Sequence, residues 1–209
     1  MRNKTGNRNG PQEVTLGTFQ KLFTPQSIVV IGASGDSSKP GGRVFKNIQE
    51  QGYQGVLWAV NPKSPSILGL PTFKSIGELP EAPELAIIAI PAPFVAHALE
   101  DLERKGVTTV IVLSAGFSEK DEKGAQEEKK LLEIANRAGM TLIGPNCVGI
   151  LTPTYAGKFA GIIPGLKKGS VDFISCSGAT VDQVMEQATV RGLSFSRTKT
   201  SKRTAAWPR

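Results

Sequence analysis

Five short segments rich in glycine, proline and small polar residues could bind a ligand, and each follows a run of aliphatic residues. They lie at positions 32–35, 61–63, 91–93, 114–118 and 144–146. In an open α/β sheet, ligands bind beyond the carboxyl ends of the strands. If the preceding runs are parallel strands of one sheet, the five segments form the floor of a single cleft.

The first segment, Gly32-Ala33-Ser34-Gly35, is a candidate phosphate-binding turn. Its glycines let the backbone approach a ligand closely, and a helix that begins after the turn directs free N–H groups toward an anion. A glycine-rich turn can also do no more than join a strand to a helix. From this segment alone, both interpretations stay open.

The second segment, Asn61-Pro62-Lys63, follows Val60 and bears on the kind of nucleotide. An NAD site usually has Asp or Glu at this point, where the carboxylate binds the free ribose hydroxyls. A lysine instead favours a ribose with an extra phosphate, as in coenzyme A or NADP. A solvated surface lysine is the other interpretation.

The third segment, Pro91-Ala92-Pro93, predicts a rigid exit from its strand. Two prolines fix φ twice and remove two backbone donors. Such an exit suits contact with flat or apolar groups, although ordinary stiffening of a loop explains it equally well.

Strands and helices alternate around these segments. We expect strands at 27–31, 56–60, 85–90, 109–113 and 141–143, and helices at 15–23, 42–51, 94–105 and 122–138. Continuous β-branched runs such as 27–31 suit strands that are buried on both faces. The alternation predicts a Rossmann-like, doubly wound parallel α/β sheet.

A second unit is expected to begin near residue 151. Residues 152–168 are predicted to be a connector, and they precede a strand at 171–174, a turn at 175–178, a helix at 179–191 and the start of a strand at 193–196. The predicted parts are an extension with a lead-in helix (1–21), a Rossmann-like domain (22–150), a partial flavodoxin-like domain (151–196) and a basic unstructured tail (197–209). We expect the unpaired edge of the partial domain to cause association or poor solubility.

The net charge of +7 comes from the two ends of the chain. Residues 1–10 and 197–209 hold eight basic residues and no acidic one, which leaves 17 basic and 18 acidic residues between them. A nucleic-acid-binding domain needs a basic face on its folded body. A nucleic-acid partner is therefore not expected.

Composition also indicates a cytoplasmic protein without a membrane segment. No apolar run approaches the roughly 20 residues of a membrane helix, and the polar, basic N-terminal residues do not form a secretory signal. Cys147 and Cys176 lack metal-ligand spacing, so we expect two reduced, buried thiols and no metal site.

In order and spacing, the five segments resemble the coenzyme A-binding domain of NDP-forming acyl-CoA synthetases, the acetate–CoA ligases. They are also similar to the α subunit of succinyl-CoA synthetase. The resemblance covers about residues 22–196, and its motifs lie at 31–34, 60–63, 90–93, 113–117 and 143–149.

This resemblance implies a role for each segment. The turn from Gly32 to Gly35 would hold the pyrophosphate of coenzyme A, and Lys63 would lie near its phosphoadenosine end. The path of the nucleotide and pantetheine would be lined by Pro91, Ala92, Pro93, Ser114, Ala115, Gly116 and Phe117. Asn146 would lie near the reacting thioester end. In the second unit, Ser177 and Gly178 match the family's Ser-x-Ser-Gly turn, where a helix N-terminus stabilises a phosphate carried by histidine.

The sequence departs from the family after residue 196. The family's phosphate-carrying histidine and its ATP-grasp nucleotide domain have no counterpart here, and His97 lies in no matching motif, so we expect a partly exposed helix residue there. The resemblance therefore implies a coenzyme A-binding module without catalytic residues of its own. ATP or ADP and Mg²⁺ would act only in the complete ligase, with an ATP-grasp subunit or domain as partner and acyl-CoA as product.

Two other functions share some of these features. One is the coenzyme A-binding part of a synthetase-like protein lysine acetyltransferase, which the lack of any acetyltransferase-like sequence disfavours. The other is an NAD(P)-binding regulator or oxidoreductase, which Lys63 and the lack of a substrate domain disfavour.

Overall fold

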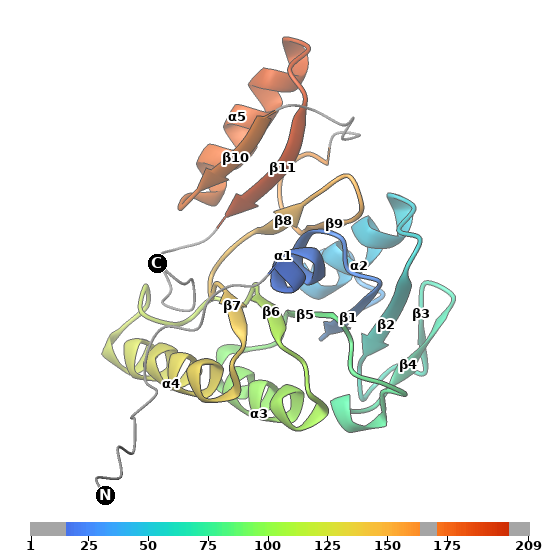
Figure 1. The fold of residues 1–209 in the computed structure, drawn as a ribbon, viewed down its shortest axis with the longest axis vertical. Helices are drawn as coiled ribbons and strands as arrows, with labels where there is room; N and C mark the ends of the chain where they lie inside the picture. The colour runs from blue at the N-terminus through green and yellow to red at the C-terminus, as the bar shows by residue number, and fades with distance from the viewer. Residues whose placement is uncertain (1–15, 164–170, 201–209) are drawn as a thin grey trace, which may run out of the picture.

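The computed structural model describes residues 16–163 and 171–200. The strands are β1 (Ser27–Ile31), β2 (Val56–Val60), β3 (Ser66–Ile67), β4 (Leu70–Phe73), β5 (Leu85–Ile88), β6 (Thr109–Val112), β7 (Thr141–Ile143), β8 (Gly149–Leu151), β9 (Ala156–Lys158), β10 (Val171–Ser175) and β11 (Phe195–Thr200). The helices are α1 (Leu16–Phe23), α2 (Pro40–Glu50), α3 (Val95–Lys105), α4 (Glu122–Ala138) and α5 (Gly178–Val190), with short 3-10 helices η1 (Ile76–Glu78) and η2 (Ala92–Phe94). Over this part of the chain the strands form two sheets, in the orders β3-β4-β2-β1-β5-β6-β7 and β10-β11-β8-β9 (Figure 1).

The larger sheet confirms the predicted doubly wound α/β fold. Strand β1 pairs in parallel with β2 on one side and with β5 on the other, and β6 and β7 continue the parallel pairing. The β3–β4 hairpin extends the sheet beyond β2, and only β3 runs antiparallel to its neighbour within this sheet. The sequence did not predict this hairpin, because its strands are only two and four residues long.

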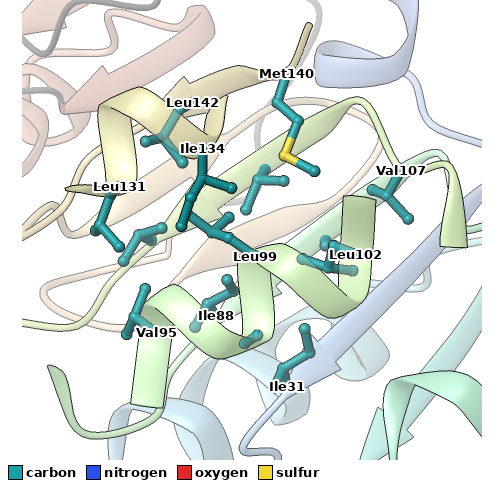
Figure 2. Close-up of a cluster of buried hydrophobic side chains, with 14 of the residues drawn as sticks. Ile31, Ile88, Val95, Leu99, Leu102, Val107, Leu131, Ile134, Met140 and Leu142 are labelled. Atoms are coloured by element: carbon teal, nitrogen blue, oxygen red, sulfur yellow. The ribbon is translucent and has the colours of Figure 1, made fainter. Parts of the chain in front are cut away.

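Helices cover both faces of the larger sheet (Figure 1). All five residues of β1 are buried, and alternate residues point to opposite faces. Val29 and Ile31 belong to the core beneath α3 and α4, which Figure 2 shows, whereas Ile28 and Val30 belong to the core beneath α2. This burial on both faces explains why the strand is aliphatic throughout.

Helix α4 has its predicted bounds because both of its ends carry strong local signals. The Asp121 carboxylate accepts a hydrogen bond of 2.7 Å from the Gly124 N–H, which caps the first turn. Gly139 ends the helix in the left-handed region, with φ of 65°.

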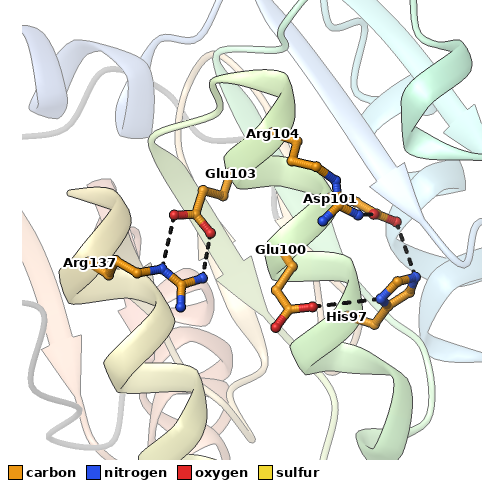
Figure 3. A network of polar contacts seen from close by, with 6 residues as sticks. All are labelled: His97, Glu100, Asp101, Glu103, Arg104 and Arg137. Atoms are coloured by element: carbon orange, nitrogen blue, oxygen red, sulfur yellow. Dashed lines mark hydrogen bonds and ion pairs between the residues drawn. The ribbon is translucent and has the colours of Figure 1, made fainter.

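The outer surface of α3 and α4 carries a network of charged side chains (Figure 3). Arg137 donates two hydrogen bonds to the Glu103 carboxylate, at 3.1 and 2.6 Å, and this contact lowers the pKa of Glu103. His97 is 74% exposed and lies 3.8 Å from both Glu100 and Asp101. His97 is therefore a helix residue as expected, and it is more exposed than the sequence indicated.

The predicted connector at 152–168 is partly a β-hairpin. Strands β8 and β9 pair with each other, and β9 packs against α2. Within the hairpin turn, Thr152 Oγ1 accepts hydrogen bonds from the N–H groups of Thr154 and Tyr155, both at 3.1 Å. These bonds form a local turn that the glycine and proline content of the segment had obscured.

Residues 197–200 belong to β11, so the prediction that an unstructured tail begins at residue 197 is wrong for these residues. Strand β11 pairs in parallel with β10 and antiparallel with β8, so it joins the hairpin to the second unit. Thr198 and Lys199 are buried there. Residues 201–209 of the predicted tail and most of 1–21 lie outside the described residues.

Helix α5 packs on the second sheet around a small core that includes Met185, Ala188, Phe195 and Leu151. Among the described helices, none is long and apolar enough to cross a membrane.

Candidate functional site

The five predicted segments lie together at one edge of the larger sheet. Strands β2, β1, β5, β6 and β7 are parallel neighbours in that order, so their carboxyl ends share this edge. Direct contacts also join the loops in the same order.

The Gly32–Gly35 turn contacts the loops on either side of it. The Asn61 side-chain amide donates a hydrogen bond of 2.8 Å to the Ala33 carbonyl. On the other side, Gly32 has φ of +85°, and a Cβ there would lie 2.5 Å from the Ala89 carbonyl oxygen. Glycine is therefore required at 32, whereas the space around Gly35 would accept a side chain.

Helix α2 begins at Pro40, two residues before the predicted start at Gly42. A Cβ on Gly41 would collide with the Gly32 carbonyl oxygen, and a Cβ on Gly42 would collide with the Asp36 carbonyl oxygen. The first turn of α2 therefore lies directly against the glycine-rich turn. Sequence reasoning missed these two glycines, although Pro-Gly-Gly before an amphipathic stretch was a usable signal.

The loop between the turn and α2 is held by Asp36. Its carboxylate accepts hydrogen bonds from the Ser38 hydroxyl at 2.6 Å and the Ser38 N–H at 2.9 Å, and these bonds lower the pKa of Asp36. Lys39 lies 3.5 Å from the same carboxylate, and the Arg43 guanidinium donates to the Ser37 carbonyl. Two cations beside one carboxylate leave this end of α2 with a net positive charge, which suits an anionic ligand.

The second loop is organised by Asn61. Its side-chain oxygen accepts hydrogen bonds from the N–H groups of Lys63 at 2.8 Å and Ser64 at 3.2 Å. Lys63 is exposed, as is Pro62, while Val60 at the end of β2 is buried. The loop therefore presents the lysine amine to solvent at the edge of the sheet.

The third and fourth loops contact each other. The Ser114 hydroxyl donates a hydrogen bond of 2.5 Å to the Ile90 carbonyl. Gly116 has φ of +106°, and a Cβ there would lie 3.4 Å from the Cβ of Ala92. Pro91 and Pro93 are both exposed on either side of Ala92, so they are available to a ligand.

The fifth loop follows a cis Gly144–Pro145 peptide bond. Asn146 has φ of +52° and donates its N–H to the Ser114 carbonyl at 2.9 Å. Asparagine tolerates this left-handed conformation better than most residues. The next residue, Cys147, is buried, and burial raises the pKa of its thiol to about 12.

The turn of the second unit lies beside the fifth loop. The Ser177 hydroxyl caps α5 by accepting a hydrogen bond of 3.3 Å from the Thr180 N–H. A Cβ on Gly178 would lie 2.6 Å from a methyl group of Val148, so α5 begins directly against the segment that follows Asn146. Cys176, in the same turn, is exposed, and the prediction of a buried thiol there is wrong.

Comparison with known proteins identifies relatives over the same region. A model of the CoA binding domain family matches residues 26–153. The α subunit of the ADP-forming acetate–CoA ligase II of Pyrococcus furiosus is 44% identical over 177 residues, which are 84% of this chain and 38% of that protein. The ADP-forming acetate–CoA ligase I of Archaeoglobus fulgidus is 40% identical over 181 residues, which are 86% of this chain and 26% of that protein.

A solved structure shows the same arrangement. The apo form of the dinucleotide-forming acetyl-coenzyme A synthetase 1 of Candidatus Korarchaeum cryptofilum aligns with a TM-score of 0.82 and 29% identity, over 88% of this chain and 40% of that one. The chain thus spans well under half of the length of each of these three relatives.

Proposed function

The chain belongs to the CoA-binding domain family and is homologous to the N-terminal region of ADP-forming acetate–CoA ligases, and on this premise we propose that its five loops bind coenzyme A as part of an acyl-CoA ligase. The observation that carries the proposal is the contact between successive loops at one edge of the sheet. A ligand as long as coenzyme A needs such a continuous surface, because it contacts the protein from its nucleotide to its thiol.

The pyrophosphate is assigned to the first loop. Gly32, Gly41 and Gly42 leave no side chain between the turn and the start of α2, so a phosphate can approach backbone N–H groups closely. Ala33, Ser34 and Gly35 form the rest of this turn. Lys39 and Arg43 supply positive charge beside it.

The other loops are assigned to the remaining parts of the ligand. Lys63 is assigned to the 3′-phosphate, because it is exposed and because residues 60–63 include no carboxylate that would bind free ribose hydroxyls instead. The exposed prolines 91 and 93 and the segment Ser114-Ala115-Gly116 would line the adenosine and pantetheine. Asn146 would lie near the thiol, whose sulfur carries the acyl group in the product.

A second anion site is assigned to Ser177 and Gly178 at the start of α5. The closeness of Gly178 to Val148 supports a position next to the proposed thiol end of the ligand. In a ligase that joins an acid to coenzyme A with conversion of ATP to ADP, a phosphate must reach this neighbourhood. An ATP-grasp subunit or domain would supply the nucleotide chemistry.

The first test is calorimetric titration of the purified chain with coenzyme A, dephospho-coenzyme A and NAD. We expect saturable binding of coenzyme A, weaker binding without the 3′-phosphate, and the weakest binding for NAD. Equal or tighter binding of NAD would contradict the proposal and support a dinucleotide site. The acetyltransferase and NAD(P) interpretations gain no support from the relatives described above, which are named as CoA ligases or synthetases.

The role of Lys63 has a test of its own. Lys63→Ala should weaken coenzyme A binding about fivefold, as expected for one exposed ion pair, and should leave dephospho-coenzyme A binding unchanged. Lys46→Ala is the matched control, because Lys46 is an exposed lysine that pairs with Glu50 further along α2. An equal loss for both ligands would remove Lys63 from the 3′-phosphate site.

A further inference from the structure

The loop after β6 is held by a carboxylate from within the same loop. Glu119 Oε1 accepts hydrogen bonds from two successive backbone N–H groups, those of Gly116 at 2.7 Å and Phe117 at 3.2 Å. Successive N–H groups that converge in this way form an anion-binding nest. Here a side chain of the protein itself occupies the nest.

The nest lies at a point where the loop must keep an unusual conformation. Gly116 is in the left-handed region, and the loop passes closely beside Ala92. The side of the loop toward the proposed ligand is fixed by neighbouring loops, through the Ser114 hydroxyl on Ile90 and the Asn146 N–H on Ser114. The conformation at Gly116 and Phe117 depends in addition on the Glu119 carboxylate.

Contacts with helix α4 fix the backbone just before Glu119. Phe117 is fully buried, and a Cβ on Gly124 would collide with its carbonyl oxygen, so α4 packs directly on this residue. Glu128, from α4, accepts a hydrogen bond of 3.1 Å from the Ser118 N–H. Glu119 therefore links a rigid helix junction to the part of the loop that faces the site.

We propose that Glu119 is a positioning residue, which holds Ser114, Ala115 and Gly116 in the conformation that receives coenzyme A. The inference rests on the proposed function, since it concerns the same site. Glu119 acts through the backbone and does not contact the ligand, because a carboxylate that faced the phosphates would repel them. Occupation of the nest by Glu119 also keeps the phosphates of the ligand from binding there.

The test compares coenzyme A binding by Glu119→Ala, Glu119→Gln and the control Glu122→Ala with that of the unaltered chain. We expect Glu119→Ala to weaken binding about tenfold, because a charge-assisted contact to two backbone donors is lost. Glu119→Gln keeps an acceptor oxygen without the charge, so its affinity for coenzyme A should lie between that of Glu119→Ala and that of the unaltered chain. Glu122→Ala removes the same charge from the exposed first turn of α4 nearby and should bind within about twofold of the unaltered chain.

Rescue by acetate distinguishes a positioning role of Glu119 from a merely structural one. A free carboxylate can enter the emptied nest, so acetate should restore much of the affinity of Glu119→Ala, whereas chloride at equal ionic strength should not. Circular dichroism melting identifies any variant that fails to fold. If Glu119→Ala does not fold, the coenzyme A affinity of Glu119→Gln is compared with that of the unaltered chain instead.

Each other outcome overturns the inference. Unchanged affinity in Glu119→Ala, or a loss that acetate does not repair, would show that the occupied nest does not position the loop. Tighter binding would show that Glu119 competes with the ligand. If the unaltered chain does not bind coenzyme A, the proposed function fails, and the inference fails with it.

Discussion

The two cysteines differ in environment, and the difference sets their chemistry. Cys147 is buried between the fifth loop and β6, where its thiol lies 3.4 Å from the Val112 carbonyl oxygen. Burial raises the pKa of this thiol to about 12. Cys176 is exposed at the start of α5. Because the thiolate is the reactive form, only Cys176 should react near neutral pH.

We therefore expect an alkylating reagent at pH 8 to label one thiol of the native chain and both thiols in denaturant. Mass spectrometry of the peptides identifies the labelled residue. Cys176→Ser is the control and should leave the native chain unlabelled. Fast native labelling of Cys147 would show that the fifth loop opens far more readily than its packing implies.

The glycines near the first turn give a second prediction at the scale of single residues. Gly41→Ala places a methyl group against the Gly32 carbonyl oxygen and should destabilise the fold by about 2 kcal/mol, with weaker coenzyme A binding. Gly35→Ala, only six positions away, meets no atom within 4 Å and should change stability by less than about 0.5 kcal/mol. Urea unfolding of both variants measures the difference, and equal values would contradict the packing described here.

These examples show which site residues the sequence could indicate. Gly32 and Asn61 follow strands directly, and Asn146 lies three residues after one, so the periodicity of the strands located them. Gly41 and Glu119 act on backbone that lies two to nine residues away, and their importance depends on how the chain folds back. The Pro-Gly-Gly pattern could have indicated Gly41, whereas no local pattern marks the contacts of Glu119.

At the scale of elements, long strands and well-capped helices were predictable from the sequence, and pairs of short strands were not. The buried run of β1 and the caps of α4 are signals within the elements themselves. The three-residue strands β8 and β9 instead depend on pairing with each other and with β11. Polar residues such as Thr198 and Lys199 gave no sign of the burial that this pairing produces.

The β9 strand also carries a buried ion pair that the sequence did not reveal. The Lys158 side chain is 1% exposed and pairs with Asp182 of α5, which is 27% exposed. The Lys158 carbonyl accepts a hydrogen bond of 2.6 Å from the Asn47 side chain of α2. Lys158 therefore contacts both helices whose N-termini are proposed to bind anions.

Loss of either Lys158 or Asp182 should destabilise the second unit, and the two substitutions should lower the free energy of unfolding by different amounts. Asp182→Asn leaves a fully buried ammonium without its counter-charge and should cost about 3 kcal/mol or more, whereas Lys158→Met leaves a partly hydrated carboxylate and should cost less. Hydrogen exchange in α5 and β9, together with urea unfolding, measures both. Lys46→Met, in an exposed pair with Glu50, is the control and should cost less than about 0.5 kcal/mol. Equal costs for the two buried-pair variants would contradict the asymmetry of burial.

At the scale of the whole molecule, the two sheets meet at the hairpin of β8 and β9. The hairpin packs on α2 of the larger sheet, and β8 pairs with β11 of the second unit. This continuity explains how so small a second unit is ordered, although its core has few residues. In Figure 1, β10 and α5 extend away from α3 and α4.

The second sheet has an exposed edge with apolar side chains. Among the described strands, β10 pairs with β11 only and forms the end of the sheet. Ile174 is 66% exposed on the face of β10 opposite Phe173, which packs toward α5. An edge strand of this kind offers unpaired backbone groups and apolar contact to a second copy of the chain.

We therefore expect concentration-dependent association of the isolated chain, measured by sedimentation velocity. Ile174→Lys should reduce it, because a lysine within an edge strand opposes pairing with a like-charged copy. Val190→Lys is the matched control, since Val190 is at least as exposed but lies at the end of α5, away from the edge. Coenzyme A binding should be unchanged in both variants, because the five loops proposed to bind it belong to the larger sheet. A monodisperse monomer at all concentrations would contradict the prediction, and an equal effect of the two substitutions would assign the association to general hydrophobicity rather than to the β10 edge.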